Sequence, residues 1–265
     1  MSLDIWTPDA LSSEACSIEH DVWRLVETQS KNSTMKLVDT LDEQNLLEQL
    51  LEDTKPPIPE ECAELHYLLF TPFRYDPGKP TAVSRFRYEG QKEGVFYSAF
   101  EVDTAVAEMT FYRMLFFSES PETKLPDNAC QFTAFTVPIK TSRALDLTNS
   151  PLSDDVDLWT DRINYDPCLK LAANARMADI DCIISQSVRD PGKGKNASIL
   201  RCRVFAATSP DRTKDQTWNI FLKPGRAEAI REFPGKTIEF LSSVFEDSRL
   251  ATYPPSKDQS ALSNP

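Results

Sequence analysis

Residues 94–116 read GVFYSAFEVDTAVAEMTFYRMLF, a short apolar run followed directly by an amphipathic segment. Residues 95–100 have the length and composition of a buried strand. From residue 102 onward the spacing is that of a helix, which Asp103 or Thr104 is expected to cap. The residues at this i, i+3, i+4 and i+7 spacing are Val102, Ala105, Val106, Met109, Tyr112, Arg113 and Phe116. The stretch therefore predicts a strand that leads straight into a helix.

Further apolar runs alternate with polar loops on both sides of this stretch. The additional strands are predicted at residues 68–73, 131–137, 182–184, 199–206 and 217–222, and a second helix at residues 168–178. Because the helices interrupt the strands irregularly, the pattern favours an α+β domain over a regularly wound parallel sheet.

Three regions are predicted along the chain. Residues 1–62 are expected to form an N-terminal helical preface packed on the core, since leucines in residues 41–51 recur at helical spacing with acids between them. Prolines at positions 56, 57 and 59 end that helix. Residues 63–250 form the main domain. Residues 251–265 are polar and contain prolines, which predicts a disordered tail.

The charge balance narrows the function classes. The chain carries 29 Lys and Arg against 41 Asp and Glu, a net charge of −12. This acidity argues against direct nucleic-acid binding and favours small, neutral or basic partners. No stretch approaches the roughly 18 apolar residues of a transmembrane helix, and no signal peptide is recognisable. A cytoplasmic protein without a membrane partner is expected.

The numbers and positions of the cysteines, histidines and glycines exclude several kinds of metal-binding and phosphate-binding site. The six cysteines lie far apart without a C-x-x-C pair, so buried thiols are expected. With only His20 and His66, a histidine-rich metal site is excluded, no metal is predicted, and His66 is expected to pack in the core. The seven glycines form no glycine-rich phosphate loop.

Three segments carry polar residues that a structural role does not readily explain. In the first, Arg74, Arg85 and Arg87 alternate with aromatic residues, among them Tyr75. Such a segment is either an edge strand with solvated arginines or an anion clamp, because guanidinium groups match phosphate oxygens and aromatic rings stack on a base.

The second segment is the strand and helix described first. Tyr97 lies on the predicted strand, and Glu108 falls at the border of the helix's buried face, early in the helix. In the third segment a buried strand runs into a polar loop that contains Ser185, Ser187 and Arg189. Loops at strand ends commonly carry binding groups, although a Ser-rich turn is also an ordinary turn.

Taken together, these segments resemble the RES-domain family, which is named for its Arg, Glu and Ser. The resemblance rests on the order of five motifs and spans residues 65–222, with a further likeness at residues 22–27 and 41–44. The motifs are Pro72-Phe73-Arg74-Tyr75, Ser84-Arg85-Phe86, Val95-Phe96-Tyr97, Thr104-Ala105-Val106-Ala107-Glu108 and Ser187-Val188-Arg189-Asp190.

The resemblance implies a core similar to the ADP-ribosyltransferases, with short mixed strands and flanking helices, and an enzyme that consumes NAD+. It also implies a toxin paired with an Xre-like antitoxin. By resemblance, Arg74 and Arg85 hold phosphates, Tyr97 positions the nicotinamide ribose, Glu108 is the central carboxylate and Ser187 completes the pocket. Tyr75, Arg87 and Arg189 are further expected to bind the dinucleotide. Arg85 and Arg87 can exchange roles, and so can Ser185 and Ser187.

The chemistry of NAD+ cleavage suits a site with one carboxylate. The leaving nicotinamide departs as a neutral molecule, so no general acid is required, and the positive charge that develops on the ribose needs a fixed anion nearby. Phosphate, water or a protein side chain can attack, and the arginines favour phosphorolysis or hydrolysis. The alternatives are a protein ADP-ribosyltransferase and a non-catalytic interaction module. Homodimer formation is left open.

Overall fold

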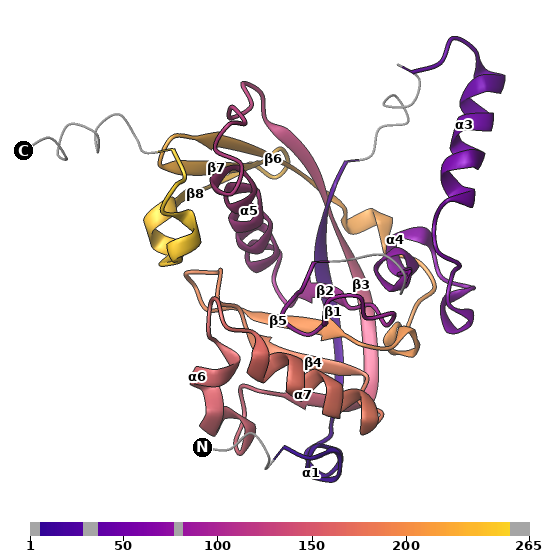
Figure 1. The fold of residues 1–265 in the computed structure, drawn as a ribbon, viewed down its shortest axis with the longest axis vertical. Helices are drawn as coiled ribbons and strands as arrows, with labels where there is room; N and C mark the ends of the chain where they lie inside the picture. Colours follow the sequence, from indigo (N-terminus) through magenta and orange to yellow (C-terminus); the bar gives the residue numbers. More distant parts are fainter. Residues whose placement is uncertain (1–5, 29–36, 77–81, 255–265) are drawn as a thin grey trace, which may run out of the picture.

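The fold is a mixed sheet with helices packed on it (Figure 1). The computed structural model describes residues 6–28, 37–76 and 82–254. Among these residues, eight strands pair in the order β1-β2-β5-β4-β3-β6-β7-β8, and β1 also pairs with β3. The strands are antiparallel except for β3 and β4, which run parallel. This architecture confirms the predicted α+β class.

Two long strands form the spine of the sheet. β1 (Cys16–Glu27) and β3 (Cys130–Asp146) pair along nearly the whole of β1, with Trp23 opposite Thr136. Side chains of β3 alternate between two cores, because successive residues of a strand point to opposite faces. Phe132 packs in one cluster of buried residues and Phe135 in another. One strand thus supports two separate layers of packing.

Five strands close into a ring. β2 (Phe96–Ala99), β5 (Lys195–Ile199) and β4 (Cys182–Gln186) connect β1 to β3, and the β1–β3 pairing completes the circuit. A buried apolar cluster drawn from all five strands includes Phe96, Phe135 and Ile184. The pairing between β1 and β2 is the shortest in the ring, because it consists of the single pair Trp23 and Ala99.

The remaining strands extend β3 beyond the ring. β6 (Gln216–Lys223), β7 (Arg226–Arg231) and β8 (Lys236–Leu241) follow in order, and α5 (Val102–Ser118) packs against this part of the sheet (Figure 1). The predicted helix is confirmed, but its predicted apolar face is wrong in the second half, where Phe111 and Met114 are buried and Tyr112 and Phe116 are exposed. Its N-cap is Glu101, whose side chain makes no capping hydrogen bond, and not Asp103 or Thr104.

The other helices lie around the ring. α1 (Pro8–Ser13), α6 (Val156–Trp159) and α7 (Asp166–Met177) pack in a third cluster with β4, to which Ile183 contributes from the outer face. α3 (Leu41–Asp53) stands apart from the sheet, and α4 (Tyr67–Phe70) follows it (Figure 1). The 3-10 helices are η2 (Glu60–Cys62), η3 (Thr71–Phe73), η4 (Leu152–Asp155), η5 (Cys202–Val204), η6 (Arg212–Lys214), η7 (Ser242–Phe245) and η8 (Ser248–Leu250).

Most predicted elements are confirmed, and two are wrong. The confirmed elements either match the predicted bounds to within a few residues or extend beyond them; they are β2, β3, β4, β6, α5 and α7. Residues 68–73 form α4 and η3, not a strand. The strand predicted at residues 199–206 ends at Ile199. Both apolar runs are short, and periodicity alone does not separate a short strand from a buried helical turn.

The all-helical preface is also wrong. The leucine-rich helix is present as α3, but residues 16–27 form β1, a full member of the central sheet. Its partner β3 is more than a hundred residues away in the sequence, so tertiary pairing decides the conformation of this segment. β7 and β8 were not predicted either.

The start of the predicted disordered tail is packed. Tyr253 is only 4% exposed, belongs to the cluster under α5, and donates a hydrogen bond to the Lys223 carbonyl. The expectation is therefore wrong for residues 251–254, while residues 255–265 lie outside the described residues. No helix in the described part of the chain is both long and apolar enough to span a membrane.

The cysteines take several environments. Cys168 and Cys182 are buried thiols, as predicted, whereas Cys16 is exposed and Cys130 half-buried. Cys62 and Cys202 are joined in a disulfide, which the sequence did not suggest. His66 is half-buried and not in the core; its Nδ1 accepts a hydrogen bond from the Leu68 amide at the start of α4.

The interior of the ring should dominate stability. Phe135 is fully buried there, so Phe135→Ala should lower the free energy of unfolding by about 3–5 kcal/mol. Phe116→Ala is the matched control, because Phe116 is 53% exposed on α5, and it should cost about 1 kcal/mol or less. Urea denaturation followed by fluorescence measures both values. Equal losses for the two variants would contradict the ring as the main core.

Candidate active site

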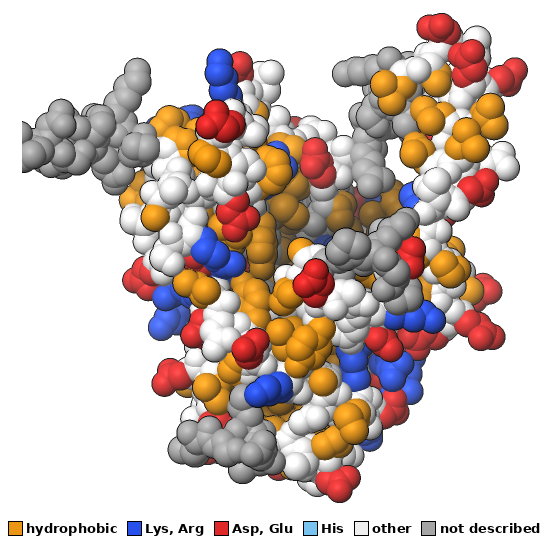
Figure 2. Space-filling view, in the orientation of Figure 1, with side chains coloured by type: hydrophobic (Ala, Val, Ile, Leu, Met, Phe, Trp, Pro, Cys, Tyr) orange, Lys and Arg blue, Asp and Glu red, His pale blue; other side chains and the backbone are white. Residues whose placement is uncertain are grey.

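A pocket of about 570 Å³ is lined in part by residues of β1 and β2, the two strands that share only one residue pair. α5 forms one wall, and segments 82–86 and 185–189 form others. Figure 2 shows this face of the molecule hollowed near its centre, with hydrophobic side chains along the hollow. The polar side chains that line the pocket are Arg24, Ser84, Arg85, Tyr97, Ser98, Glu108, Tyr112, Glu119, Tyr165, Ser185, Gln186, Arg189, Asn196, Ser198 and Arg249.

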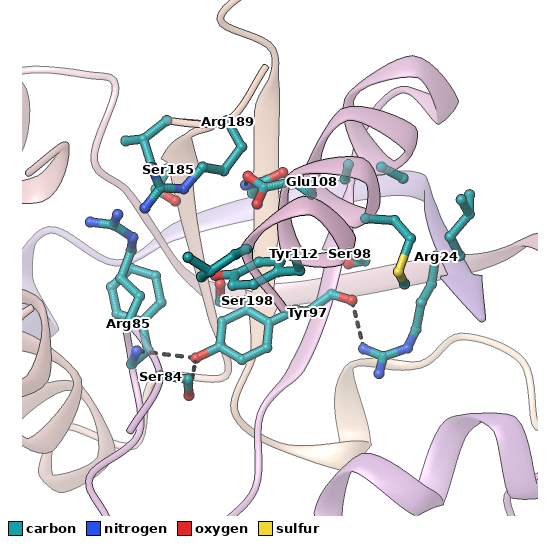
Figure 3. A pocket seen from close by; sticks show the side chains of 18 of the residues that line it. Arg24, Ser84, Arg85, Tyr97, Ser98, Glu108, Tyr112, Ser185, Arg189 and Ser198 are labelled. Atoms are coloured by element: carbon teal, nitrogen blue, oxygen red, sulfur yellow. Dashed lines mark hydrogen bonds between the residues drawn. The ribbon is translucent and has the colours of Figure 1, made fainter. Parts of the chain in front are cut away.

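Glu108 is the carboxylate at the centre of this pocket (Figure 3). Its Oε1 accepts hydrogen bonds from Ser187 Oγ and Asn196 Nδ2, both at 2.6 Å. Its Oε2 makes no hydrogen bond to any described residue. One oxygen therefore fixes the side chain, and the other is left to accept from a ligand.

The loop after β4 holds Ser187 in place to donate to Glu108. Ser187 Oγ accepts hydrogen bonds from the amides of Arg189 and Asp190, at 3.2 and 3.0 Å. Because those contacts occupy its acceptor positions, its proton is directed to Glu108. Thr104 Oγ1 donates to Asp190 Oδ2 at 2.7 Å, which ties this loop to the first turn of α5.

A glycine permits the close approach of the loop to the helix. A Cβ at position 194 would overlap Thr104 Oγ1 and crowd the Asp190 carboxylate. The Gly194 amide also donates to Asp190 Oδ2 at 3.1 Å. Any side chain at Gly194 would push the loop away from α5 and Ser187 away from Glu108.

Tyr97 fastens a second loop to β2. Its hydroxyl shares a hydrogen bond with Ser84 Oγ at 2.8 Å and accepts one from the Phe86 amide at 3.1 Å (Figure 3). Burial raises the pKa of Tyr97. Desolvation of its hydroxyl, and after it the charge of Glu108, also raises the pKa of Tyr112, although the residue as a whole is 49% exposed, so both tyrosines remain protonated at neutral pH.

Two arginines face the pocket from opposite sides (Figure 3). Arg85 donates to the Trp159 carbonyl at 2.8 Å and lies over the Tyr165 ring. Arg24 donates to the Tyr97 carbonyl at 2.7 Å and lies over the Phe96 ring. In the part of the chain that the structure describes, no carboxylate forms an ion pair with either.

The half-buried Arg24 carries a charge that is costly to leave without a counter-ion. Its Nε has no hydrogen-bond partner among the described residues. Burial lowers the pKa of Arg24 to about 10, so the group still carries its charge at neutral pH. Because partly buried charges are normally paired, these two guanidiniums would favour an anionic ligand in the pocket.

Arg189 differs from these two because its charge is already neutralised. It is 1% exposed, its Nη1 donates to Asp247 Oδ2 at 2.6 Å, and its Nη2 donates to the Arg162 carbonyl at 2.6 Å. Its guanidinium lies 4.0 Å from the centre of the Phe111 ring. Arg189 thus lines the pocket but mainly supports the loop that carries Ser187.

The structure places the residues expected from the sequence in three groups. Arg85, Tyr97, Glu108 and Arg189 line the pocket, as does Ser185, whereas Ser187 lies behind Glu108 and orients it. Ser185 and Ser187 therefore have different positions and are not interchangeable.

Arg74, Tyr75 and Arg87 do not line the pocket. Arg74 donates to the Pro56 carbonyl at 2.7 Å and to Glu52 at 2.6 Å, which connects it to α3. Arg87 is buried over the Tyr75 ring and donates to the Ala82 carbonyl at 3.0 Å. Of the two arginines proposed for exchange, Arg85 is the one that faces the pocket.

Sequence reasoning missed two central groups. Arg24 lies in the segment 22–27, whose likeness to the family was the only signal for it. Asn196 gave no signal, because its role depends on the β2–β5 and β4–β5 registers that set it opposite Ala99 and Ser185.

The fold and the pocket define an α+β protein with an arginine-flanked carboxylate. The RES domain model matches residues 58–222, 165 of the 265 residues in the chain. The chain therefore belongs to the RES domain family, which confirms the resemblance seen in the sequence.

Curated proteins and solved structures provide two further comparisons. No curated protein matches the chain. Among solved structures, the chain is similar to one in the crystal structure of the M. tuberculosis MbcT-MbcA toxin-antitoxin complex, with a TM-score of 0.40 and 8% sequence identity. The match covers 94% of this chain and 99% of that chain.

The buried pair of Arg189 and Asp247 should be necessary for the fold around the site. Asp247→Ala leaves Arg189 buried without its counter-charge, so the free energy of unfolding should fall by about 3–5 kcal/mol. The double variant Arg189→Met, Asp247→Leu removes both charges and should recover most of that loss. Chemical denaturation measures each variant.

Glu246→Ala is the control for this prediction. It removes the neighbouring surface pair with Arg162, in which the Glu246 side chain is 69% exposed, and it should change stability by about 1 kcal/mol or less. If the double variant were as unstable as Asp247→Ala, the unpaired charge of Arg189 would not be the cause of the lost stability.

Proposed function

We propose that this protein is an enzyme that cleaves the nicotinamide–ribose bond of NAD+ and acts as the toxin of a toxin–antitoxin pair. One observation carries the proposal: Glu108 keeps an unbonded carboxylate oxygen in a pocket flanked by two arginines that form no ion pair with a described residue. Membership of the RES domain family supports it. We further propose that the core of the fold is similar to that of the ADP-ribosyltransferases.

Glu108 would act by electrostatic stabilisation. As the bond breaks, nicotinamide leaves as a neutral molecule and positive charge develops on the ribose. The carboxylate is held rigidly by Ser187 and Asn196, so it does not have to reorganise as that charge appears. Its second oxygen can also accept from a ribose hydroxyl.

The arginines would bind the pyrophosphate. Arg24 and Arg85 lie on opposite sides of the pocket (Figure 3), and each guanidinium offers donors that match phosphate oxygens. Tyr97, between them, would position the nicotinamide ribose. Contacts from Arg24 and Arg85 to the pyrophosphate would hold the dinucleotide so that its nicotinamide–ribose bond lies beside Glu108.

Phosphorolysis or hydrolysis would complete the reaction. Inorganic phosphate would give ADP-ribose 1-phosphate, and water would give ADP-ribose, each with release of nicotinamide. The positive potential from Arg24 and Arg85 favours an anionic nucleophile. An Xre-like antitoxin would inhibit the enzyme by covering the pocket, with acidic groups placed against these arginines.

Glu108→Gln tests the central role of the carboxylate. Glutamine keeps an acceptor oxygen for Ser187 and Asn196 but removes the charge, so NAD+ consumption should fall by about 10²–10³. Purified wild type and variant are incubated with NAD+ in phosphate and in phosphate-free buffer, and the products are separated by chromatography. Glu122→Gln, at an exposed position outside the pocket, should keep wild-type activity.

The products decide between the candidate functions. Loss of NAD+ only in phosphate indicates phosphorolysis, and loss in both buffers indicates hydrolysis. Label from NAD+ that appears on a protein would replace the proposal with protein ADP-ribosylation. If the folded wild-type protein consumes no NAD+ in either buffer, the remaining interpretation is a non-catalytic interaction module.

A second experiment tests which arginine binds the phosphates. Arg24→Met should raise KM for NAD+ by about 10–100-fold, because it removes an unpaired charge from the pocket wall. Arg74→Met is the matched control, since Arg74 is bonded to Glu52 and Pro56 outside the pocket. Steady-state kinetics on both variants gives the answer. A larger effect from Arg74 would place the phosphates where the family resemblance alone implied.

A further inference from the structure

The pocket continues along α5 well beyond Glu108. The residues of α5 and its C-cap that line it are Ala105, Glu108, Met109, Tyr112, Leu115 and Glu119. Their spacing of three and four residues puts them on one face of the helix. Glu119 follows Glu108 by 11 residues, which is about 16 Å along a helix axis. This separation is of the order needed for a second nucleoside joined through a pyrophosphate.

The walls of this extension are apolar. Trp23 and Leu25 point to the same side of β1 and belong, with Met109 and Leu115, to one apolar cluster that lines the pocket. Val83, at the edge, is also a lining residue. No arginine or lysine belongs to this set. The extension can therefore enclose a flat, uncharged aromatic ring and gain from burying it.

The far end of the extension carries negative charge. Glu119 is exposed and makes no ion pair or side-chain hydrogen bond within the described ranges. It is also the C-cap of α5, a helix of 17 residues, so the partial negative charge of the helix C-terminus adds to its own. Arg249, another cation of the pocket, is already paired with Asp247 at 2.8 Å.

We propose that this extension is the adenosine subsite of the pocket and that Glu119 makes the enzyme select NAD+ over NADP+, an inference that rests on the proposed function. The dinucleotide runs from the nicotinamide ribose at Glu108 through the pyrophosphate to the adenosine ribose at Glu119, and the adenine ring turns back from that ribose against the apolar residues of β1 and α5. The Glu119 carboxylate accepts hydrogen bonds from the hydroxyls of the adenosine ribose, as acidic residues do in other dinucleotide sites. A 2′-phosphate at the same place would face this carboxylate and the helix C-terminus, and it would be repelled.

The test compares three substrates. Nicotinamide release is measured from NAD+, NADP+ and nicotinamide mononucleotide, which lacks adenosine. Wild type should show kcat/KM for NAD+ at least about tenfold above that for NADP+. Glu119→Gln keeps the shape and removes the charge, so the preference should shrink about tenfold, mostly through a lower KM for NADP+. Values for the mononucleotide should not change.

Glu122→Gln is the control for net charge, because Glu122 is exposed on the loop after α5 and does not line the pocket. It should leave the preference as in wild type. Equal use of NAD+ and NADP+ by wild type, or an unchanged preference in Glu119→Gln, would overturn the inference while leaving the proposed function intact.

Binding measurements separate the two proposals. Calorimetric titration of wild type and Glu119→Gln with each dinucleotide needs no turnover. Tighter binding of NAD+ than NADP+ by wild type, reduced in Glu119→Gln, supports the subsite even if no nicotinamide is released and the proposed catalysis fails. Equal affinities overturn the subsite, and absence of binding to either dinucleotide overturns both proposals.

Discussion

The pairing of β1 with β3 is the constraint on which the rest of the molecule depends. β3 is 17 residues long, which lets it pair with β4 near one end, with β6 near the other, and with β1 along most of its length. This pairing closes the ring of strands, but β1 meets β2 at only one residue pair. Residues of both strands around that pair line the pocket, so the strands that build the core also contribute to the site. α5 follows β2 directly and carries Glu108 to the opening.

The position of Glu108 depends on contacts with distant parts of the chain. Ser187 and Asn196, which hold its Oε1, lie 79 and 88 residues further along. The loop with Ser187 is in turn held by the bond between Thr104 and Asp190 and by the buried charge of Arg189. In a chain of net charge −12, acidic partners for arginines are abundant. That Arg24 and Arg85 have none among the described residues is therefore a property of the pocket, and its cost is offset when an anion binds.

The sequence predicted the elements with strong periodicity and failed where partners are remote. α5 was predicted as a helix, although with a different buried face, and β3 was predicted from the apolar run at residues 131–137, which covers only part of the strand. β1 has mixed polar and apolar residues, and only its pairing with β3 makes it a strand. In the site, Glu108, Tyr97 and Arg85 were predicted and line the pocket. Arg74 and Arg87 were expected there because they stand in the same aromatic-rich segment, but a neighbouring position in sequence does not fix the direction of a side chain.

By itself, the sequence determined the α+β class, the helix that carries Glu108 and membership of a family. These properties follow from local spacing and from the order of motifs, which need no knowledge of long-range contacts. Only the tertiary structure decided that Arg24 faces the pocket, that Ser187 lies behind Glu108 while Ser185 lines the cavity, and that the pocket extends along α5 to Glu119. The physical reason is that strand register and the packing of α5 on the sheet bring together residues from distant parts of the chain. Such pairings depend on packing over the whole sheet and leave no periodic trace in the sequence.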